Sequence, residues 1–142
     1  MIHLFVIGKY KNKHFEELEK DYLKRFSFLK LTIHELKTET DIEKKITQLG
    51  AKLSHLYLLD ERGSELSTVE LKNKIEDHIE KSTAIFFAIG AAMGHSESLK
   101  KSTKELISLS PLTLPHKFAR LLLVEQLYRV QTLLTNHPYH NA

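Results

Sequence analysis

The sequence predicts an α/β protein whose mostly parallel sheet is covered by helices on both faces. Short apolar runs typical of strands alternate along the chain with stretches whose apolar residues recur every three or four positions. The last helical stretch is apolar on nearly all of its sides. Strands that alternate with helices favour a parallel sheet, because each crossover places a helix on one face of it.

Four β-type runs are predicted to form the main strands, and a shorter fifth run follows them. They cover residues 2–7, 31–36, 55–60, 83–89 and 107–109. Three helices are predicted between the first four strands. Their apolar stripes are formed by Phe15, Leu18, Tyr22 and Phe26, then by Ile42, Ile46, Leu49 and Leu53, then by Leu71, Ile75 and Ile79.

Two of these helices carry the spacing of a capping box, in which a hydroxyl and a carboxylate satisfy free N–H groups. The pairs are Thr40 with Glu43 and Ser67 with Glu70. A fourth helix is expected after Gly94, with Leu99, Thr103 and Leu106 facing inward. The last helix is predicted over about residues 116–134. Because it is apolar all round, we expect the sheet on one side and another layer or subunit on the other.

The composition is that of an ordinary soluble protein. Of the 142 residues, 42% are hydrophobic and 27% are charged, which argues against disordered, collagen-like and fibrous classes. The length predicts one domain over residues 1–142. The sequence has 0 Cys, which excludes disulfide frameworks, cysteine nucleophiles and cysteine-ligated zinc.

Neither a membrane segment nor an export signal is predicted. The apolar run of the last helical stretch, residues 121–124, is far shorter than the roughly 20 residues of a spanning helix. The apolar start of the chain has no preceding basic region and continues into Gly8 and Lys9, which is typical of a strand rather than a signal peptide. We therefore expect a cytoplasmic protein with no membrane partner.

The net charge of +3 is unevenly distributed. Residues 1–82 hold 15 basic and 15 acidic side chains, whereas residues 83–142 hold 6 and 3. An anionic partner would therefore be attracted to the C-terminal part, although an ordinary basic surface explains the same imbalance.

Three segments follow strands at the edge where ligands bind in open α/β sheets. They are residues 58–63 (Leu-Leu-Asp-Glu-Arg-Gly), 89–94 (Ile-Gly-Ala-Ala-Met-Gly) and the proline-bracketed loop 109–116. Together they could line one pocket, or each could be a simple turn. The glycines match neither the dinucleotide-binding pattern nor the phosphate loop of NTPases.

The tail, residues 136–142, is rich in His and Tyr. A zinc site at His137 and His140 is weakly supported, because Pro138 prevents a helical pairing of the two. Stacking on an RNA base is the sharper hypothesis, and a disordered end fits the composition equally well.

Five motifs in order carry a resemblance to a known family. They are Leu-Asp-Glu-Arg-Gly (59–63), Ile-Gly before a small-residue loop (89–94), Leu-Thr-Leu-Pro-His (112–116), Glu-Gln-Leu-Tyr-Arg (125–129) and Asn-His-Pro-Tyr-His (136–140). The chain resembles the ribosomal RNA large subunit methyltransferase H family of the SPOUT class. The resemblance implies a C-terminal trefoil knot, a homodimer with facing knots, and no metal. It also implies methyl transfer from S-adenosylmethionine to N3 of a pseudouridine in 23S rRNA of the assembled ribosome.

The resemblance also implies roles for particular residues. The cofactor would be held, largely through backbone groups, by Leu59, Gly90, Leu109, Ser110, Pro111, Leu112, Thr113 and Leu114. The substrate base would be handled by His137, Tyr139 and His140, none of which identifies itself as the general base. RNA contacts are expected from Lys117, Arg120 and Arg129. Alternatively, either arginine pairs with Glu125 and only orders the helix.

The chain departs from the family pattern at a few positions. Ala91 and Ala92 stand where a second glycine and often a proline are usual, Ser64 replaces a common lysine, and the tail ends in Ala142 rather than a basic residue. A methyl group at Ala91 would crowd a backbone position that, in the family, approaches the cofactor or needs a positive φ, so we expect cofactor binding that persists with an affinity no higher than usual. A non-catalytic ribosome-binding or assembly factor, and a plain small-ligand α/β protein, are the competing hypotheses.

Overall fold

The computed structural model describes residues 1–90 and 94–141. Within them, strands form one sheet in the order β2-β1-β4-β3-β5, and every pairing is parallel. The strands are β1 (Ile2–Ile7), β2 (Leu31–Leu36), β3 (Leu56–Glu65), β4 (Ile85–Ile89) and β5 (Glu105–Ser108). The predicted α/β class with a parallel sheet is confirmed.

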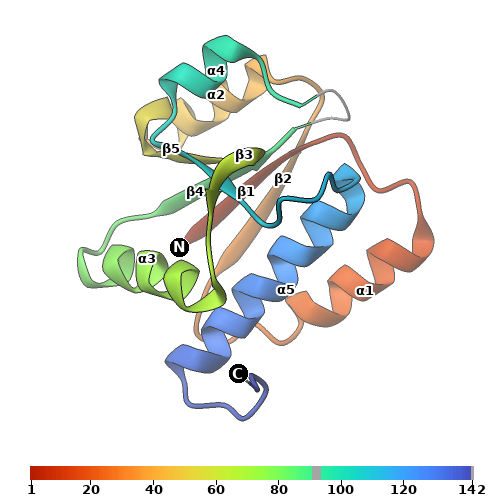
Figure 1. Cartoon of the computed structure of the whole chain (residues 1–142), viewed down its shortest axis with the longest axis vertical. Coiled ribbons are helices and arrows are strands. Elements are labelled where there is room, and N and C mark those ends of the chain that lie inside the picture. Colours follow the sequence, from red (N-terminus) through yellow and green to blue (C-terminus); the bar gives the residue numbers. More distant parts are fainter. Residues whose placement is uncertain (91–93, 142) are drawn as a thin grey trace.

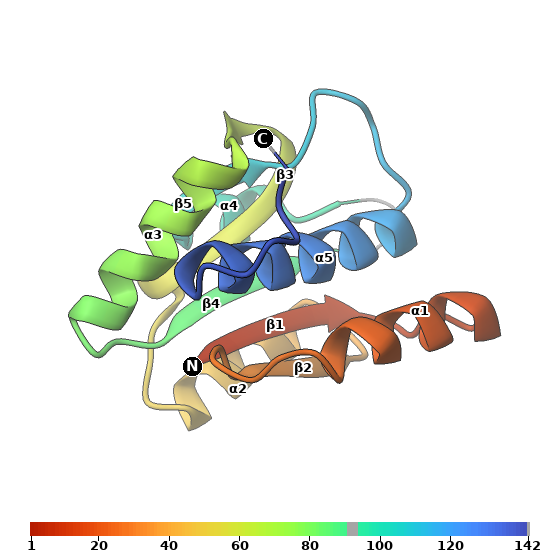
Figure 2. The ribbon, with the colours of Figure 1, turned by 90° about the horizontal axis from the view of Figure 1, so that it is seen from below.

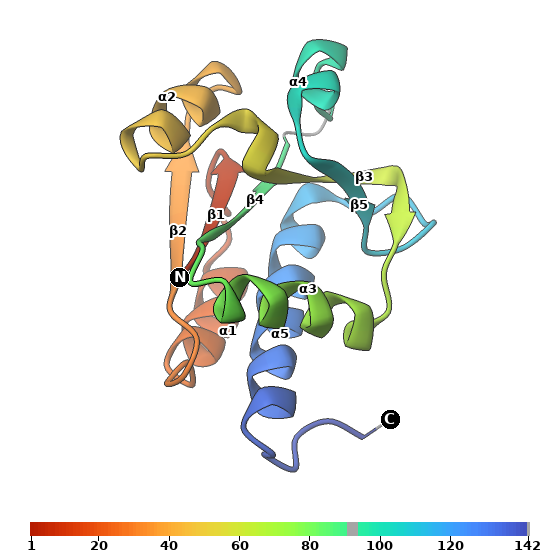
Figure 3. The same cartoon turned by 90° about the vertical axis from the view of Figure 1, so that its left-hand side faces the viewer.

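Helices lie on both faces of the sheet, as expected. They are α1 (Lys13–Leu23), α2 (Thr40–Gln48), α3 (Thr68–Glu80), α4 (Glu97–Ser102) and α5 (His116–Leu134), with a 3-10 turn, η1 (Leu53–His55). Helices α1, α3 and α5 cover one face (Figure 2). Helices α2 and α4 lie together across the sheet from α3 and α5 (Figure 3).

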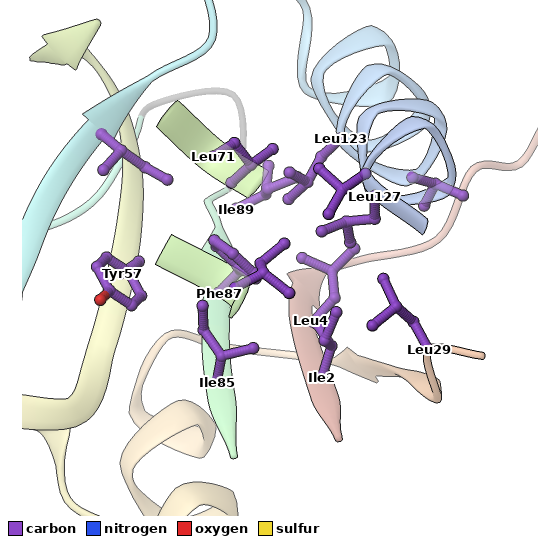
Figure 4. Close-up of a cluster of buried hydrophobic side chains, with 14 of the residues drawn as sticks. Ile2, Leu4, Leu29, Tyr57, Leu71, Ile85, Phe87, Ile89, Leu123 and Leu127 are labelled. Carbon is purple, nitrogen blue, oxygen red and sulfur yellow. The ribbon is translucent and has the colours of Figure 1, made fainter. Parts of the chain in front are cut away.

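Alternation along the strands divides the core into two clusters. Leu4 and Phe87 face α5, whereas their neighbours Phe5 and Phe86 face the side of α2 and α4. All residues of β4 are buried, as expected for a central strand of a parallel sheet. In Figure 4, Leu123 and Leu127 of α5 point toward the side chains of the strands.

Two local predictions at helix ends have different outcomes. The capping box of Ser67 and Glu70 is confirmed, because each side chain accepts the other's backbone N–H. The capping box at Thr40 is wrong, since Thr40 already lies inside α2 and the N-cap residue is Glu39. Instead, Asp41 accepts hydrogen bonds from the amide and hydroxyl of Thr38.

Helix α4 is shorter than predicted. It ends at Ser102, and the next residue, Thr103, has an extended backbone. The amide of Lys104 then donates to the carbonyl of Leu56 at 2.9 Å. Leu106 is therefore part of β5, and its expected helical position is wrong.

Helix α5 has the bounds that the sequence predicts. One side packs on the sheet, and its flanks contact α1 and α3 (Figure 2). Phe118 and Leu122 remain 51% and 43% exposed. A second subunit over these side chains stays a prediction.

Gln131 of α5 fixes the segment that leads into β2. Its side-chain oxygen accepts the amide protons of Ser27, Phe28 and Leu29, each at 3.0 Å. Its amide nitrogen donates to the carbonyl of Arg25 at 2.9 Å. Because Gln131 is only 4% exposed, these bonds satisfy backbone groups that have little access to water.

Candidate functional site

The carboxyl ends of β1 and β4 meet the start of α5. The loop after β1, the end of β4 and the first turn of α5 line a small hollow of about 10 Å³. Gly8, Lys9, Gly90, His116 and Lys117 are among its lining residues. Gly90, one of the expected cofactor residues, therefore lies beside Lys117, one of the expected RNA contacts.

A larger hollow of about 290 Å³ lies where β3 and β5 end. Leu66, Ser67, Ile107, Leu109 and Gln126 contribute to its walls, which come from α3, α5 and the strand ends. Its volume is close to the lower limit of small-molecule sites, about 300 Å³. Its lining mixes apolar side chains with a few polar groups, which suits an amphipathic ligand.

After Leu59 the pairing of β3 with β5 is interrupted while β3 itself continues, so this segment is not a simple turn. Pairing of β3 with β5 stops at Leu59 and resumes at Ser64, and β3 continues to Glu65. Asp60 accepts the amide proton of Arg62 at 2.8 Å and pairs with Lys100 of α4 at 3.1 Å. Although burial alone would raise the pKa of Asp60, these partners together lower it.

Gly63 is required where this segment passes β5. A Cβ atom at this position would lie 2.6 Å from the carbonyl carbon of Leu106 and 2.7 Å from the nitrogen of Ile107. Real Cβ atoms do not approach backbone atoms this closely. A side chain at position 63 would therefore push the 59–63 segment away from β5.

The loop between β5 and α5 is connected to the 59–63 segment. The Thr113 hydroxyl donates to the carboxylate of Glu61, and Figure 2 shows the loop as a wide arch between β5 and α5. Within the loop, Ser108 accepts the amide proton of Ser110 at 3.2 Å and donates to its carbonyl at 2.7 Å. Leu112 points outward and is 70% exposed.

His95 covers Gly90. A Cβ atom at Gly90 would lie 3.0 Å from the His95 ring. His95 is 8% exposed, and neither ring nitrogen has a hydrogen-bond partner among the described residues. Burial lowers the pKa of His95 despite the charges of Glu39 and Asp60. Ala91 and Ala92 lie outside the described residues, so their expected effect on the cofactor stays a prediction.

The Glu61–Thr113 contact joins the 58–63 and 109–116 segments, and Gly90 follows β4, which pairs with β3 up to Leu58 and Ala88. The three strand-end segments therefore lie at one edge of the sheet. Their residues do not share a single hollow. Gly90 lines the smaller one and Leu109 the larger one, while Leu59 and Leu109 also contact the core. The arrangement offers two separate hollows, which share no lining residue, rather than the one pocket that the sequence suggested.

The His- and Tyr-rich tail folds back along α5. Asn136 has a left-handed backbone, with a φ of 57°, and the amide of His137 donates to the carbonyl of Thr132 at 2.8 Å. The Tyr139 hydroxyl donates to Glu125 at 3.0 Å, and its ring meets the Tyr128 ring edge-on at 4.9 Å. The tail is therefore held by specific contacts.

Glu125 organises the polar groups of the tail. It accepts hydrogen bonds from Arg129 at 2.6 and 3.0 Å, and Arg129 lies 4.8 Å from the Tyr139 ring centre and 3.2 Å from Nδ1 of His140. Burial and hydrogen bonds with Tyr22 and Glu125 raise the pKa of Tyr139. Its phenol therefore stays protonated at neutral pH and can donate a hydrogen bond.

Arg120 is enclosed by protein groups. Its guanidinium donates to Glu19 through two nitrogens and to Glu35 through the third, each at 2.8 Å. It also lies 4.0 Å from the centre of the Tyr10 ring and is 7% exposed. Arg129 pairs with Glu125, as the alternative interpretation expected. For both arginines the geometry favours an ordering role, and RNA binding by either stays a prediction.

Comparisons with known proteins give the family. The family model described as "Predicted SPOUT methyltransferase" matches residues 1–140. The chain belongs to this family. Proteins named ribosomal RNA large subunit methyltransferase H are similar to it along nearly their whole length. That of Koribacter versatilis is 38% identical over 138 residues, with 96% of this chain and 94% of the relative covered. That of Coprothermobacter proteolyticus is 34% identical, with 98% of each chain covered.

In this SPOUT family member, the strand-end loop precedes α5, and the tail folds back along α5 from its other end. The loop leads into the first turn of α5, and the tail follows its last turn (Figure 1). With 19 residues, α5 is about 28 Å long. The tail nevertheless returns to the middle of the helix, where Tyr139 contacts Glu125 and Leu109 lines a hollow with Gln126. Among the described residues, no hydrogen bond joins His137, Tyr139 or His140 to Leu112 or Thr113.

The described part of the chain, residues 1–90 and 94–141, has neither a metal-ligand cluster nor a membrane-spanning helix. No group of three or more His, Asp or Glu side chains there is arranged to hold a metal ion. No helix there is long and apolar enough to cross a membrane.

Proposed function

We propose that this chain methylates N3 of a pseudouridine in 23S rRNA of the assembled ribosome, using S-adenosylmethionine. Membership of the SPOUT methyltransferase family and the names of the relatives support an rRNA methyltransferase. The observation that carries the proposal further is the Glu61–Thr113 contact. It joins two of the segments proposed to hold the cofactor at the carboxyl edge of the sheet, where ligands bind in such folds.

The residues at this edge suit a cofactor that is held mainly by backbone groups. The amides of Thr113 and Leu114 donate to no other described residue, and Pro111 keeps the loop stiff. The larger hollow beside Leu109 provides an apolar wall with polar groups. We assign cofactor contacts to Leu59, Gly90, Leu109, Ser110, Pro111, Leu112, Thr113 and Leu114. When bound, S-adenosylmethionine supplies a methyl carbon activated by its sulfonium.

The contribution of the protein to methyl transfer is mainly orientation. Positioning two reactants in this way can lower a barrier by about 7–11 kcal/mol. We assign the handling of the base to His137, Tyr139 and His140, with Lys117 contacting RNA. The hydroxyl of Tyr139 donates its one proton to Glu125, so its oxygen is left to accept a hydrogen bond from an N–H group of the base. The group that accepts the proton from N3 is not assigned.

A homodimer is part of the proposal. Within the described part of one chain, no hydrogen bond joins the tail to Leu112 or Thr113, and a second copy would bring its own tail to this loop. Exposed apolar side chains near α5 support such an interface: Val69, Leu112, Phe118 and Leu122. The trefoil knot belongs to the proposal as well, and a ribosomal substrate places the protein in the cytoplasm.

The decisive experiment is mass spectrometry of 23S rRNA from a strain that lacks the gene. We expect N3-methylpseudouridine to disappear and to return when the purified protein and S-adenosylmethionine are added to ribosomes from that strain. An unchanged level of the modified nucleoside in the deletion strain would refute the proposed function.

Calorimetry with S-adenosylmethionine separates the enzyme from a non-catalytic ribosome-binding factor. The proposal expects binding by the full chain, and loss of methyl transfer with retained cofactor binding when the chain is truncated before Tyr139. No binding by the full chain would favour the factor.

A further inference from the structure

Five lysines gather where β1, β2 and α5 meet. They are Lys9, Lys11, Lys13, Lys37 and Lys117, and we refer to them as the lysine rim. Lys9 and Lys11 lie in the loop after β1, Lys13 begins α1, Lys37 follows β2, and Lys117 lies in the first turn of α5. The first four are exposed and Lys117 is half-buried.

Contacts between these elements make the rim one surface. Lys9 and Lys117 line the same small hollow. The amide of Gly8 donates to the carbonyl of Leu36 at 2.8 Å, which places Lys37 beside the loop after β1. The rings of Phe15 and Phe118 meet edge to face at 5.0 Å, so the first turns of α1 and α5 are neighbours.

The acidic side chains at this end are engaged by other groups. Both oxygens of Glu19 and one of Glu35 accept hydrogen bonds from Arg120. Glu39 accepts hydrogen bonds from the amide and hydroxyl of Ser96. Within residues 1–90 and 94–141, no lysine of the rim forms an ion pair.

This arrangement changes what the charge distribution along the sequence suggests. Residues 1–82 are balanced in charge, but in the fold Arg120 pairs with Glu19 and Glu35, while the exposed lysines of the rim face water. The exposed acids near the rim in sequence are Glu16 on the first turn of α1, its neighbour Glu17, and Glu35, two positions before Lys37. They offset part of the charge and leave a local excess of lysine.

We propose that the lysine rim docks on the phosphate backbone of ribosomal RNA, as a surface separate from the tail. Flexible lysines bind phosphates as point charges and read no sequence, so the rim would fix the position of the protein while the tail meets the base. The choice of ribosomal RNA as the partner rests on the proposed function. The existence of an anion-binding surface rests on the lysines and their neighbours alone.

The test is the salt dependence of binding to purified ribosomes. The variant Lys9→Ala/Lys11→Ala/Lys13→Ala is compared with the intact chain between 50 and 300 mM salt, on the order of the range over which phosphate contacts weaken. Each lost contact lowers the slope of log K against log salt by about 0.7–0.9. We expect the slope to fall by about 2 and the affinity at low salt to fall by about tenfold or more.

A matched control removes the same charge elsewhere. Lys30, Lys44 and Lys101 are exposed and lie outside the rim, so Lys30→Ala/Lys44→Ala/Lys101→Ala should leave the slope near that of the intact chain. Thermal unfolding and calorimetry with S-adenosylmethionine verify that both triple variants fold and keep the cofactor site. If the two variants lose equal slope, or neither loses any, the proposal is wrong.

Crosslinking identifies what the rim touches. A photoreactive group at position 11 should crosslink to ribosomal RNA, and crosslinking to a ribosomal protein alone would overturn the proposal. The measurements are independent of methylation. If the intact chain transfers no methyl group but its salt slope depends on the rim, the proposed function is refuted and the docking surface is kept. If it transfers methyl groups and the slope does not depend on the rim, the docking surface is refuted and the proposed function is kept.

Discussion

Arg120 and Arg129 lie toward opposite ends of α5 and serve the molecule differently. Arg120 is buried between two carboxylates contributed by α1 and β2, and it fixes the sheet edge beneath the lysine rim. Arg129 is partly exposed and pairs with Glu125 on its own helix, where it holds the tail. The same residue type thus ties distant segments together at one end and positions a terminal segment at the other.

The largest expected effect comes from Arg120→Ala. It leaves Glu19 and Glu35 without their cation, and breaking a buried ion pair from one side costs about 3–5 kcal/mol. Arg129→Ala should lower the free energy of unfolding by only about 1 kcal/mol, because the pair is partly exposed. Urea unfolding of both variants measures the difference. Equal losses would mean that burial does not distinguish the two ends.

Gln131→Leu tests whether burial or position along α5 determines how much stability is lost. Gln131 lies at the tail end, but it satisfies four backbone groups of residues 25–29. Leaving these groups without partners should cost about 3 kcal/mol. Hydrogen exchange should show faster opening of residues 27–29. A cost below that of Arg129→Ala would contradict this account.

Tyr139→Phe isolates the hydrogen bond to Glu125 and keeps the ring contact with Tyr128. We expect a stability loss of about 0.5–1.5 kcal/mol and a larger relative loss of methyl transfer than of cofactor binding. Single-turnover methylation and calorimetry on the same preparation compare the two. Unchanged methylation would show that the hydroxyl of Tyr139 has no role in positioning the base.

The smallest expected effect is at His95, which lies between β4 and α4. Burial lowers the pKa of His95, so the unfolded chain takes up this proton at a higher pH than the folded chain. Stability is therefore retained above about pH 6.5 and lost as the pH falls toward the folded-state value. His95→Leu should flatten this acid-side loss in thermal unfolding measured from pH 7 to 5, whereas His14→Leu, at an exposed position, should not.

Elements with strong local signals were predictable from the sequence. Helix α5 begins after Pro115 and has a continuous apolar pattern, so its bounds matched the prediction. The first two strands, β1 and β2, also have the bounds that their apolar spacing predicted. Helix α4 was predicted too long, because Leu106 continues the helical spacing of Leu99 and Thr103 while tertiary pairing places it in a strand.

Features that depend on distant segments were not predictable. Glu19 and Glu35 are separated from Arg120 by 101 and 85 positions, and nothing local marks them as its partners. The need for glycine at position 63 arises from the backbone of β5. The three strand-end segments were identified in advance, but their division between two hollows depends on side-chain packing.

The strand order also has a kinetic consequence. Strand β1 pairs with the central strand β4, so Ile2 must find Ile85, which lies more than half of the chain away in sequence. Contacts between such distant positions form slowly, because the loss of chain entropy precedes any gain from the contact. Refolding should therefore take milliseconds to seconds rather than microseconds, on the order of other domains with predominantly non-local pairing. During that interval the β1 and β4 edges are open to association with other unfolded chains.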